Sequence, residues 1–339
     1  MSVAATNSAG AVRFQVQPYK PDTGFALSGM AMLLSSLAIV GAALGFVAHF
    51  ISQYFWLIIL FPALIGGALG AVGARMTRQG RVRNPWIGGL AGFLGGALAM
   101  LLMHYFDYRT FKDDTVGKLH PDIVELAKAP PAEQQRQLAP LNAEDRSNVE
   151  LALRAARVDG FGSYLDFNAH VGVQINKATS GKDKGLNLGY YGSYTYWAIE
   201  VLIVAGITFA MVRKATATPF CRDCDQWKNA KVLGGFTGDA TAAAAAVNAG
   251  DLSALATAGP ATGGPAQLTV ACCDACVGRG SIDVQLDALT VDAKGNTSTK
   301  TLAHATYPAA ALPYLVKLFE PQPVSVAPAD GTPPPPMPA

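Results

Sequence analysis

The longest apolar stretch of the chain runs from Phe25 to Ala74 and contains no Asp, Glu, Lys or Arg. A helix rises about 1.5 Å per residue, so this stretch far exceeds one hydrocarbon core of ~30 Å and is expected to form two helices. Two shorter apolar stretches follow. The pattern predicts an integral membrane protein with four transmembrane helices, at about 28–50, 55–73, 86–106 and 194–212.

The ends of these helices carry residues that suit them. Asn84 can cap the third helix, Pro85 fits its first position, and Trp86 prefers the membrane interface. An aromatic belt marks the start of the fourth helix, made of Tyr190, Tyr191, Tyr194, Tyr196 and Trp197. We expect the first helix to be retained rather than cleaved as a signal peptide, because its apolar stretch is long and no A-x-A-like site follows.

Arginines set the expected orientation, because short cytoplasmic loops are rich in Lys and Arg. The segment 75–83 contains four arginines and no acid, whereas the turn at 51–54 contains no charge. Arg213 and Lys214 follow the fourth helix. This pattern predicts that both termini lie in the cytoplasm and that residues 107–193 form a large outer loop.

The segments outside the predicted membrane helices divide into a tail, an outer loop domain and a cytoplasmic part. Residues 1–27 form a polar cytoplasmic tail that we expect to be mostly unstructured at 1–24. The outer loop domain is predicted to be small and rich in helix, with short helices at 121–128 and 131–138 and a longer one capped by Asn142. Fewer than ninety residues make a marginal domain, so this loop is expected to pack on the membrane helices or on a partner.

The cytoplasmic part after the fourth helix, 213–320, changes character along its length. An alanine-rich insert at 234–264 predicts one or two short helices. Alternating apolar and polar positions then predict strands at 282–291 and 297–306, with a closing helix at 308–319. The final residues, 321–339, are rich in proline and predict a disordered tail.

All five cysteines lie in this cytoplasmic part. They read as Cys221-x-x-Cys224 and Cys273-x-x-Cys276, with Cys272 beside the second pair as an alternate ligand. Paired C-x-x-C turns suit tetrahedral zinc, and the reducing cytoplasm disfavours disulfides. The spacing predicts structural zinc in a zinc-ribbon-like α+β domain; a redox-active thiol pair and unliganded cysteines are the alternatives. A site closed by four thiolates leaves no position for substrate.

Two segments carry a family resemblance. Residues 197–200, Trp-Ala-Ile-Glu, and residues 219–227, Pro-Phe-Cys-Arg-Asp-Cys-Asp-Gln-Trp, resemble a pattern in uncharacterised bacterial multi-pass membrane proteins. In that group three helices, an outer loop and a fourth helix precede a cytoplasmic zinc knuckle. The resemblance implies the layout and adds nothing on mechanism. The expected fold class is thus a mainly α membrane protein with a separate cytoplasmic zinc-ribbon-like domain.

Small residues recur at four-residue spacing in three of the predicted membrane helices. The glycines are Gly41 and Gly45, Gly66 and Gly70, and Gly88, Gly92 and Gly96. Such faces let two helix backbones approach closely. They predict tight packing within the bundle; the alternatives are a homo-oligomer interface and room for a ligand or lipid.

Three ionisable residues lie near the expected outer side of the membrane, namely His49, His104 and Glu200. Charged groups at membrane depth are costly, so such a cluster can share a proton or hold a metal ion. The plainer interpretation is that these residues make ordinary contacts at wet helix ends.

The functional expectation rests on these features. The net charge of +2 favours no particular partner, and no nucleic-acid partner is predicted. The sequence contains no G-x-S-x-G, H-E-x-x-H or nucleotide-binding loop. The leading hypothesis is a non-enzymatic scaffold or coupling protein of the bacterial inner membrane, with a periplasmic outer loop and a structural zinc-binding cytoplasmic docking module. It is expected to contact the lipid bilayer and a protein partner or a second copy. The alternative is a transporter or membrane enzyme subunit that uses His49, His104 and Glu200.

Overall fold

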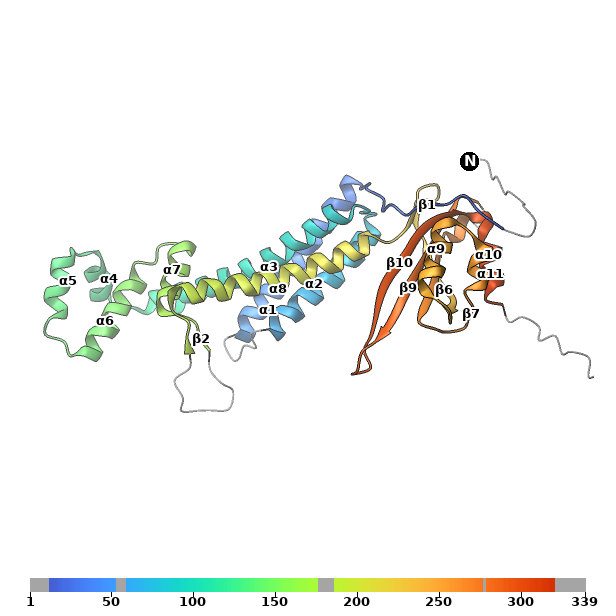
Figure 1. The fold of residues 1–339 in the computed structure, drawn as a ribbon. Coiled ribbons are helices and arrows are strands. Elements are labelled where there is room, and N and C mark those ends of the chain that lie inside the picture. Colours follow the sequence, from blue (N-terminus) through green and yellow to red (C-terminus); the bar gives the residue numbers. More distant parts are fainter. Residues whose placement is uncertain (1–11, 53–58, 176–185, 277–278, 321–339) are drawn as a thin grey trace, which may run out of the picture. The chain divides into compact units, whose positions relative to one another are not determined.

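The computed structural model describes residues 12–52, 59–175, 186–276 and 279–320. The chain divides into two compact units. One is the helical unit, residues 21–218. The other is the sheet unit, which combines residues 1–20 with residues 219–339. Figure 1 shows the elements of each unit.

Four long apolar helices form the helical unit. They are α1 (Leu27–Ser52), α2 (Leu60–Gln79), α3 (Pro85–Asp114) and α8 (Gly189–Thr216). Each is long and apolar enough to cross a membrane, which confirms the four helices expected from the sequence. The expected turn at 51–54 and the expected start of the second helix at 55 extend into residues outside the described ranges.

The observed helices extend past the predicted ends. α3 continues beyond residue 106 into a polar stretch, and α2 carries Arg75 and Arg78 on its last turns. Hydrophobicity marks where lipid ends, whereas a helix ends only where its backbone hydrogen bonds stop, so the two boundaries differ. Asn84 caps α3 as expected, its side chain accepting hydrogen bonds from the backbone N–H groups of Trp86 and Ile87 at 3.0 and 3.1 Å.

The glycine faces bring helices of this one chain together. A Cβ on Gly66 would lie 2.9 Å from the backbone oxygen of Val204 in α8, and one on Gly96 would lie 2.7 Å from the Cα of Ala205. Gly45 similarly faces the backbone of α3. These glycines therefore provide close helix packing within the bundle. A homo-oligomer through such faces stays a prediction.

Shorter helices follow α3. They are α4 (Pro121–Lys128), α5 (Pro131–Leu138), α6 (Ala143–Ala156) and α7 (Phe161–Val171). Asn142 caps α6 by accepting from the Asp145 N–H at 2.8 Å, as the sequence predicted. α7 packs on α3 through aromatic rings, with Phe111 lying 5.2 Å from Tyr164 and 5.3 Å from Phe167 between centroids. A short ladder of β2 (Gln174–Ile175) with β3 (Leu186–Asn187) leads into α8.

The sheet unit contains a six-stranded antiparallel sheet in the order β1-β10-β9-β8-β6-β7. Its strands are β1 (Gln17–Pro18), β6 (Asn229–Phe236), β7 (Pro260–Ala261), β8 (Ala266–Cys272), β9 (Ser281–Val291) and β10 (Thr297–Pro308). Three helices accompany it: α9 (Ala240–Ala249), α10 (Leu252–Thr257) and α11 (Leu312–Leu318). This separate sheet region is confirmed, and it is larger than the two strands that the sequence predicted.

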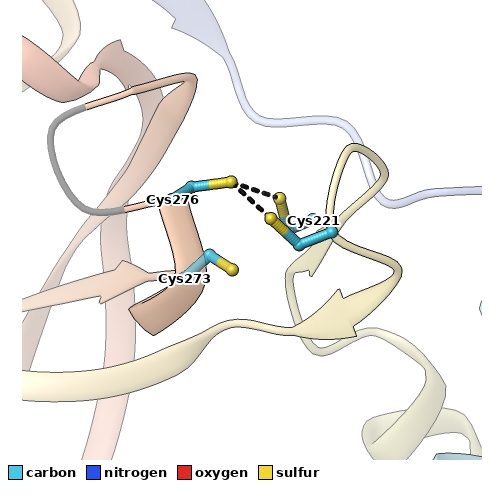
Figure 2. Close-up of side chains that lie close together, drawn as sticks. Cys221, Cys273 and Cys276 are labelled. Atoms are coloured by element: carbon cyan, nitrogen blue, oxygen red, sulfur yellow. Dashed lines mark hydrogen bonds between the residues drawn. The ribbon is translucent and has the colours of Figure 1, made fainter.

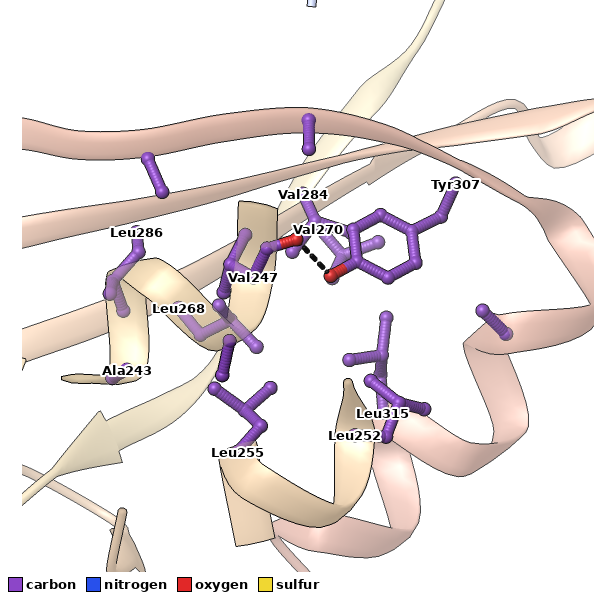
Figure 3. Packing of buried hydrophobic residues seen from close by; sticks show 14 of the residues in the cluster. Ala243, Val247, Leu252, Leu255, Leu268, Val270, Val284, Leu286, Tyr307 and Leu315 are labelled. Carbon is purple, nitrogen blue, oxygen red and sulfur yellow. Dashed lines mark hydrogen bonds between the residues drawn. The ribbon is translucent and has the colours of Figure 1, made fainter. Parts of the chain in front are cut away.

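The core of the sheet unit lies between the sheet and these helices (Figure 3). Ala243 and Val247 of α9 are fully buried there, so the alanine-rich segment forms part of the core rather than an insert in it. Alanine allows α9 to approach the strands closely because its side chain is small. Tyr307 of β10 is buried and donates a hydrogen bond to the backbone oxygen of Val247 at 2.6 Å.

The N-terminal segment belongs to the same unit. Gln17 and Pro18 pair with Thr306 and Ala305 of β10, and Phe14 is 7% exposed within the core. Among the described residues 12–24, Arg13, Gln17 and Pro18 form β-pairing and the other positions carry no regular element, so packing on the sheet unit rather than secondary structure of its own holds this segment. Sequence patterns miss this segment because its strand is two residues long and gains its stability from partners far along the chain.

Candidate functional site

The first pair of cysteines lies on a tight hairpin formed by β4 (Phe220–Cys221) and β5 (Gln226–Trp227). Phe220 and Trp227 are paired across it, with ring centroids 5.1 Å apart in an edge-to-face arrangement. Asp225 occupies the left-handed backbone region at φ 54°, which aspartate tolerates in turns. The hairpin therefore turns Cys221 and Cys224 toward one side.

The second pair follows β8 directly. β8 ends at Cys272, and the short helix η2 (Asp274–Cys276) comes next. Asn229, at the start of β6, pairs with Cys272 at the end of β8. Because β6 follows the hairpin almost at once, antiparallel pairing of β6 with β8 brings the two cysteine pairs to the same end of the sheet.

Four thiols meet there. The Sγ atoms of Cys221, Cys224, Cys273 and Cys276 all lie within 4.8 Å of one another. Cys276 Sγ lies 2.6 Å from Cys224 Sγ and 3.6 Å from Cys221 Sγ. Figure 2 shows the side chains of Cys221, Cys273 and Cys276 lying close together. All are free thiols. A tetrahedral site with Zn–S bonds of about 2.3 Å requires sulfur–sulfur distances of about 3.8 Å, so small shifts of these side chains allow all four to bind one ion.

Cys272 is not part of this group. Its half-buried side chain packs against the core of the sheet instead. Successive residues of a strand point to opposite faces, and Cys272 is the last residue of β8. This placement separates two neighbouring cysteines that the sequence left interchangeable.

Hydrogen bonding controls the protons of the cluster. A hydrogen bond with Cys224, together with a second one with Cys221, raises the pKa of the Cys276 thiol well above its ordinary value. A metal ion held by these sulfur atoms would displace their protons, because thiolates rather than thiols bind metals.

A buried ion pair lies beside the hairpin. Lys228, the residue after β5, donates to Asp283 of β9 at 2.8 Å and to the backbone oxygen of Ser281 at 2.9 Å. Both side chains are almost fully buried, being 4% and 5% exposed. The pair fixes the start of β6 against β9 and thereby supports the end of the sheet that carries the cysteines. No local pattern marks it, since its partners come together only through the strand order.

The helical unit holds a second polar cluster. His49 Nδ1 lies 2.5 Å from Asp107 Oδ1, and His104 Nδ1 lies 3.6 Å from Asp107 Oδ2. One carboxylate therefore joins the two histidines that the sequence singled out. Glu200 is 2% exposed and accepts a hydrogen bond from the Tyr196 hydroxyl at 2.5 Å.

A cavity of about 370 Å³ adjoins this cluster. Its lining residues come from α3, α7, α8 and their neighbours: Ser52, Met103, His104, Asp107, Tyr164, Leu165, Asn168, Gly172, Val173, Gln174, Tyr196, Trp197 and Glu200. The sequence pattern did not reveal Asp107, because the apolar stretch of the third helix ends at residue 106. The i,i+3 spacing from His104, with no helix-breaking residue between, is the signal that would have found it.

Comparisons of the chain with protein-family models, curated proteins and solved structures find no match. The resemblance carried by residues 197–200 and 219–227 therefore stays a prediction. Any function assigned to the chain must rest on the geometry of its two side-chain clusters.

Proposed function

We propose that this chain is a non-enzymatic scaffold of the bacterial inner membrane whose cytoplasmic sheet unit is closed by one structural zinc ion. The observation that carries the proposal is the group of four thiols contributed by two segments far apart in the sequence. Four soft thiolate ligands in two C-x-x-C turns favour zinc and occupy every position of a tetrahedral ion. Such a site stabilises a fold and leaves no place for a substrate.

The orientation has independent support within the sheet unit. Its core contains Phe14 from the N-terminal segment together with residues that follow the fourth helix. Four apolar helices separate these two parts of the chain, so an even number of crossings returns both parts to one side. The arginine-rich end of α2 favours the cytoplasm for that side. The cysteines then lie in a reducing compartment, where metal binding is preferred to disulfides.

The bilayer is the first proposed partner. Long apolar side chains on all four long helices are exposed in the monomer, including Ile39 at 70%, Leu64 at 58%, Leu90 at 56% and Leu202 at 59%. Lipid contact would cover these side chains without a protein partner. The four membrane helices would hold the zinc-containing sheet unit at the membrane surface. There the sheet unit would couple a membrane complex to cytoplasmic proteins.

Metal analysis of the full-length protein, purified in detergent, tests the zinc site. We expect one zinc per chain. Cys273→Ser should lower the zinc content to near zero, whereas Cys272→Ser should leave it unchanged, although the two residues are adjacent. Equal zinc content in both variants, or no zinc in the parent protein, would contradict the proposal.

Proximity labelling from the sheet unit in intact cells tests the scaffold function. Proteins enriched by the parent chain should be lost with Cys273→Ser and kept with Cys272→Ser, at equal membrane abundance of the three chains. The proposal fails if the labelled set is the same for all three, or if the enriched set is absent altogether.

A further inference from the structure

We propose that the helical unit binds a small organic ammonium ion in the cavity between α3, α7 and α8. This proposal goes beyond the scaffold function and rests on different residues. The cavity of about 370 Å³ lies where α1 ends and α8 begins, and its volume suits a ligand of a few to about a dozen heavy atoms. Its wall determines which ligand chemistry fits.

The wall offers two carboxyl groups as hydrogen-bond acceptors. Asp107 and Glu200 both line the cavity, and neither a lysine nor an arginine is among the described lining residues. Carboxylates accept hydrogen bonds and donate none when ionised. An anion is therefore disfavoured here, and a ligand that carries positive charge and N–H donors is favoured.

His104 adds a specific acceptor. Its Nδ1 lies 3.6 Å from Asp107 Oδ2, and in the tautomer with the proton on Nδ1 the Nε2 atom is a hydrogen-bond acceptor. That Nε2 atom is buried, and among the described residues it has no hydrogen-bond partner. A ligand N–H in the cavity would satisfy this buried nitrogen.

Aromatic rings complete the wall. Trp197, Tyr164 and Tyr196 line the same cavity as the two carboxylates. The faces of such rings attract cations, most strongly for Trp, and aromatic side chains around a site are a known way to bind organic ammonium groups. The ring centroids of Trp197 and His104 lie 5.7 Å apart, so one ligand in the cavity can contact both side chains.

A divalent metal ion fits this wall less well. Among the described residues, the cysteine quartet is the group of three or more His, Cys, Asp and Glu whose ligand atoms converge, and the His49, His104, Asp107 and Glu200 set does not converge in that way. Asp107 is also divided between two imidazoles. The polar groups are spread around the cavity instead of converging on one point, which suits an organic ligand better than a metal ion.

The test is calorimetric titration of the full-length protein in lipid nanodiscs with benzylammonium and ethylammonium. Benzyl alcohol and ethanol are the matched neutral probes, and Mn²⁺ is the metal probe. We expect saturable binding of at least one ammonium ion, at least tenfold tighter than its neutral match. The charged group supplies that difference, because charge-assisted hydrogen bonds are about twice as strong as neutral ones.

Variants place the binding in the cavity. Glu200→Gln keeps the side-chain shape and the acceptor for Tyr196, and it should weaken ammonium binding at least tenfold. Glu125→Gln, on the exposed face of α4, is the matched control and should leave binding unchanged. Trp197→Phe keeps an aromatic ring and should weaken binding by a smaller factor.

Four outcomes would overturn the proposal: no saturable binding of any ammonium ion, equal affinity for the neutral probes, unchanged affinity in Glu200→Gln, and saturable Mn²⁺ binding that displaces the ammonium ion. Equal zinc content in the parent and the Glu200→Gln chain shows that the sheet unit is intact. Failure here therefore leaves the scaffold proposal standing.

Discussion

Tyr19 stacks on His304, with ring centroids 3.8 Å apart and ring planes inclined by 15°. The first residue precedes all four apolar helices and the second follows them. The Tyr19 N–H also donates to the His304 backbone oxygen at 3.1 Å. This contact extends the pairing of β1 with β10, so segments that precede and follow the four helices form one sheet.

The same histidine predicts a pH dependence. Burial lowers the pKa of His304 below its ordinary value of 6.5. The folded sheet unit therefore favours the neutral ring, whereas the unfolded chain takes up a proton as the pH falls through about 6.5. Stability should be complete above that pH and decline below it, with a slope of at most about 1.4 kcal/mol per pH unit.

Hydrogen exchange of β9 and β10 amides between pH 7 and pH 5, corrected for intrinsic rates, measures this decline. His304→Phe keeps a ring to stack on Tyr19 and removes the titration, so its slope should be smaller. Identical slopes for the two proteins would show that another group is responsible.

Phe14 tests whether the N-terminal segment stabilises the sheet unit. The side chain is 7% exposed and meets Tyr314 edge-on, with centroids 5.6 Å apart. Phe14→Ala should lower the free energy of unfolding of this unit by about 3–5 kcal/mol, the usual cost of truncating a buried Phe. Arg13→Ala, which removes a surface ion pair with Asp251, should cost about 1 kcal/mol or less. Hydrogen exchange on the full chain distinguishes the two, and equal effects would argue against Phe14 as a core residue.

Removal of the proposed zinc ion should loosen only one end of the sheet unit. The β4–β5 hairpin has two paired positions, and an isolated two-stranded hairpin is marginally stable in water. A strong zinc chelator should therefore increase amide exchange at 220–227 and 273–276, while β8, β9 and β10 stay protected by their own core. Cys272→Ser, which keeps all four ligands, should respond as the parent does. Loss of protection throughout the sheet would mean that the metal supports the whole unit.

Two adjacent glycines of α2 should respond in opposite directions to alanine. A Cβ on Gly66 would lie 2.9 Å from the Val204 backbone oxygen, whereas one on Gly67 would meet nothing within 4 Å. Gly66→Ala should destabilise the bundle by about 1–3 kcal/mol through overpacking. Gly67→Ala should be neutral or stabilising by up to about 1 kcal/mol, because alanine favours helix more than glycine. Thermal unfolding in detergent, followed by circular dichroism, measures both; equal midpoints would contradict the packing of α2 on α8.

The buried ion pair should show strong coupling. Lys228→Met leaves the Asp283 carboxylate buried without its cation, which costs about 3–5 kcal/mol in comparable sites. Adding Asp283→Asn removes that charge. The new amide oxygen can still accept from the Thr306 hydroxyl, which donates to Asp283 Oδ1 at 2.7 Å in the parent chain. The double variant should therefore be more stable than Lys228→Met alone. Denaturant titrations read out by exchange of β9 amides would reveal the coupling, and simple additivity of the two single changes would refute it.

The sequence alone determined the features that depend on neighbouring residues. The apolar stretches predicted the four long helices, since lipid requires continuous hydrophobicity. Asn84 and Asn142 predicted two helix starts, because a cap bonds to N–H groups two or three residues ahead. The C-x-x-C spacing predicted a metal-binding group, since each pair forms within one turn.

The tertiary structure decided what depends on partners distant in the chain. It placed Cys273 in the thiol group and Cys272 outside it, because the end of β8 fixes the direction of each side chain. It placed Phe14 in the core and Ala243 beneath the sheet, although both lie in segments without a regular apolar pattern. It also joined His49 and His104 through Asp107, because α3 continues past the apolar stretch. Long-range pairing and packing decide these contacts, and their energies appear only once the chain has folded.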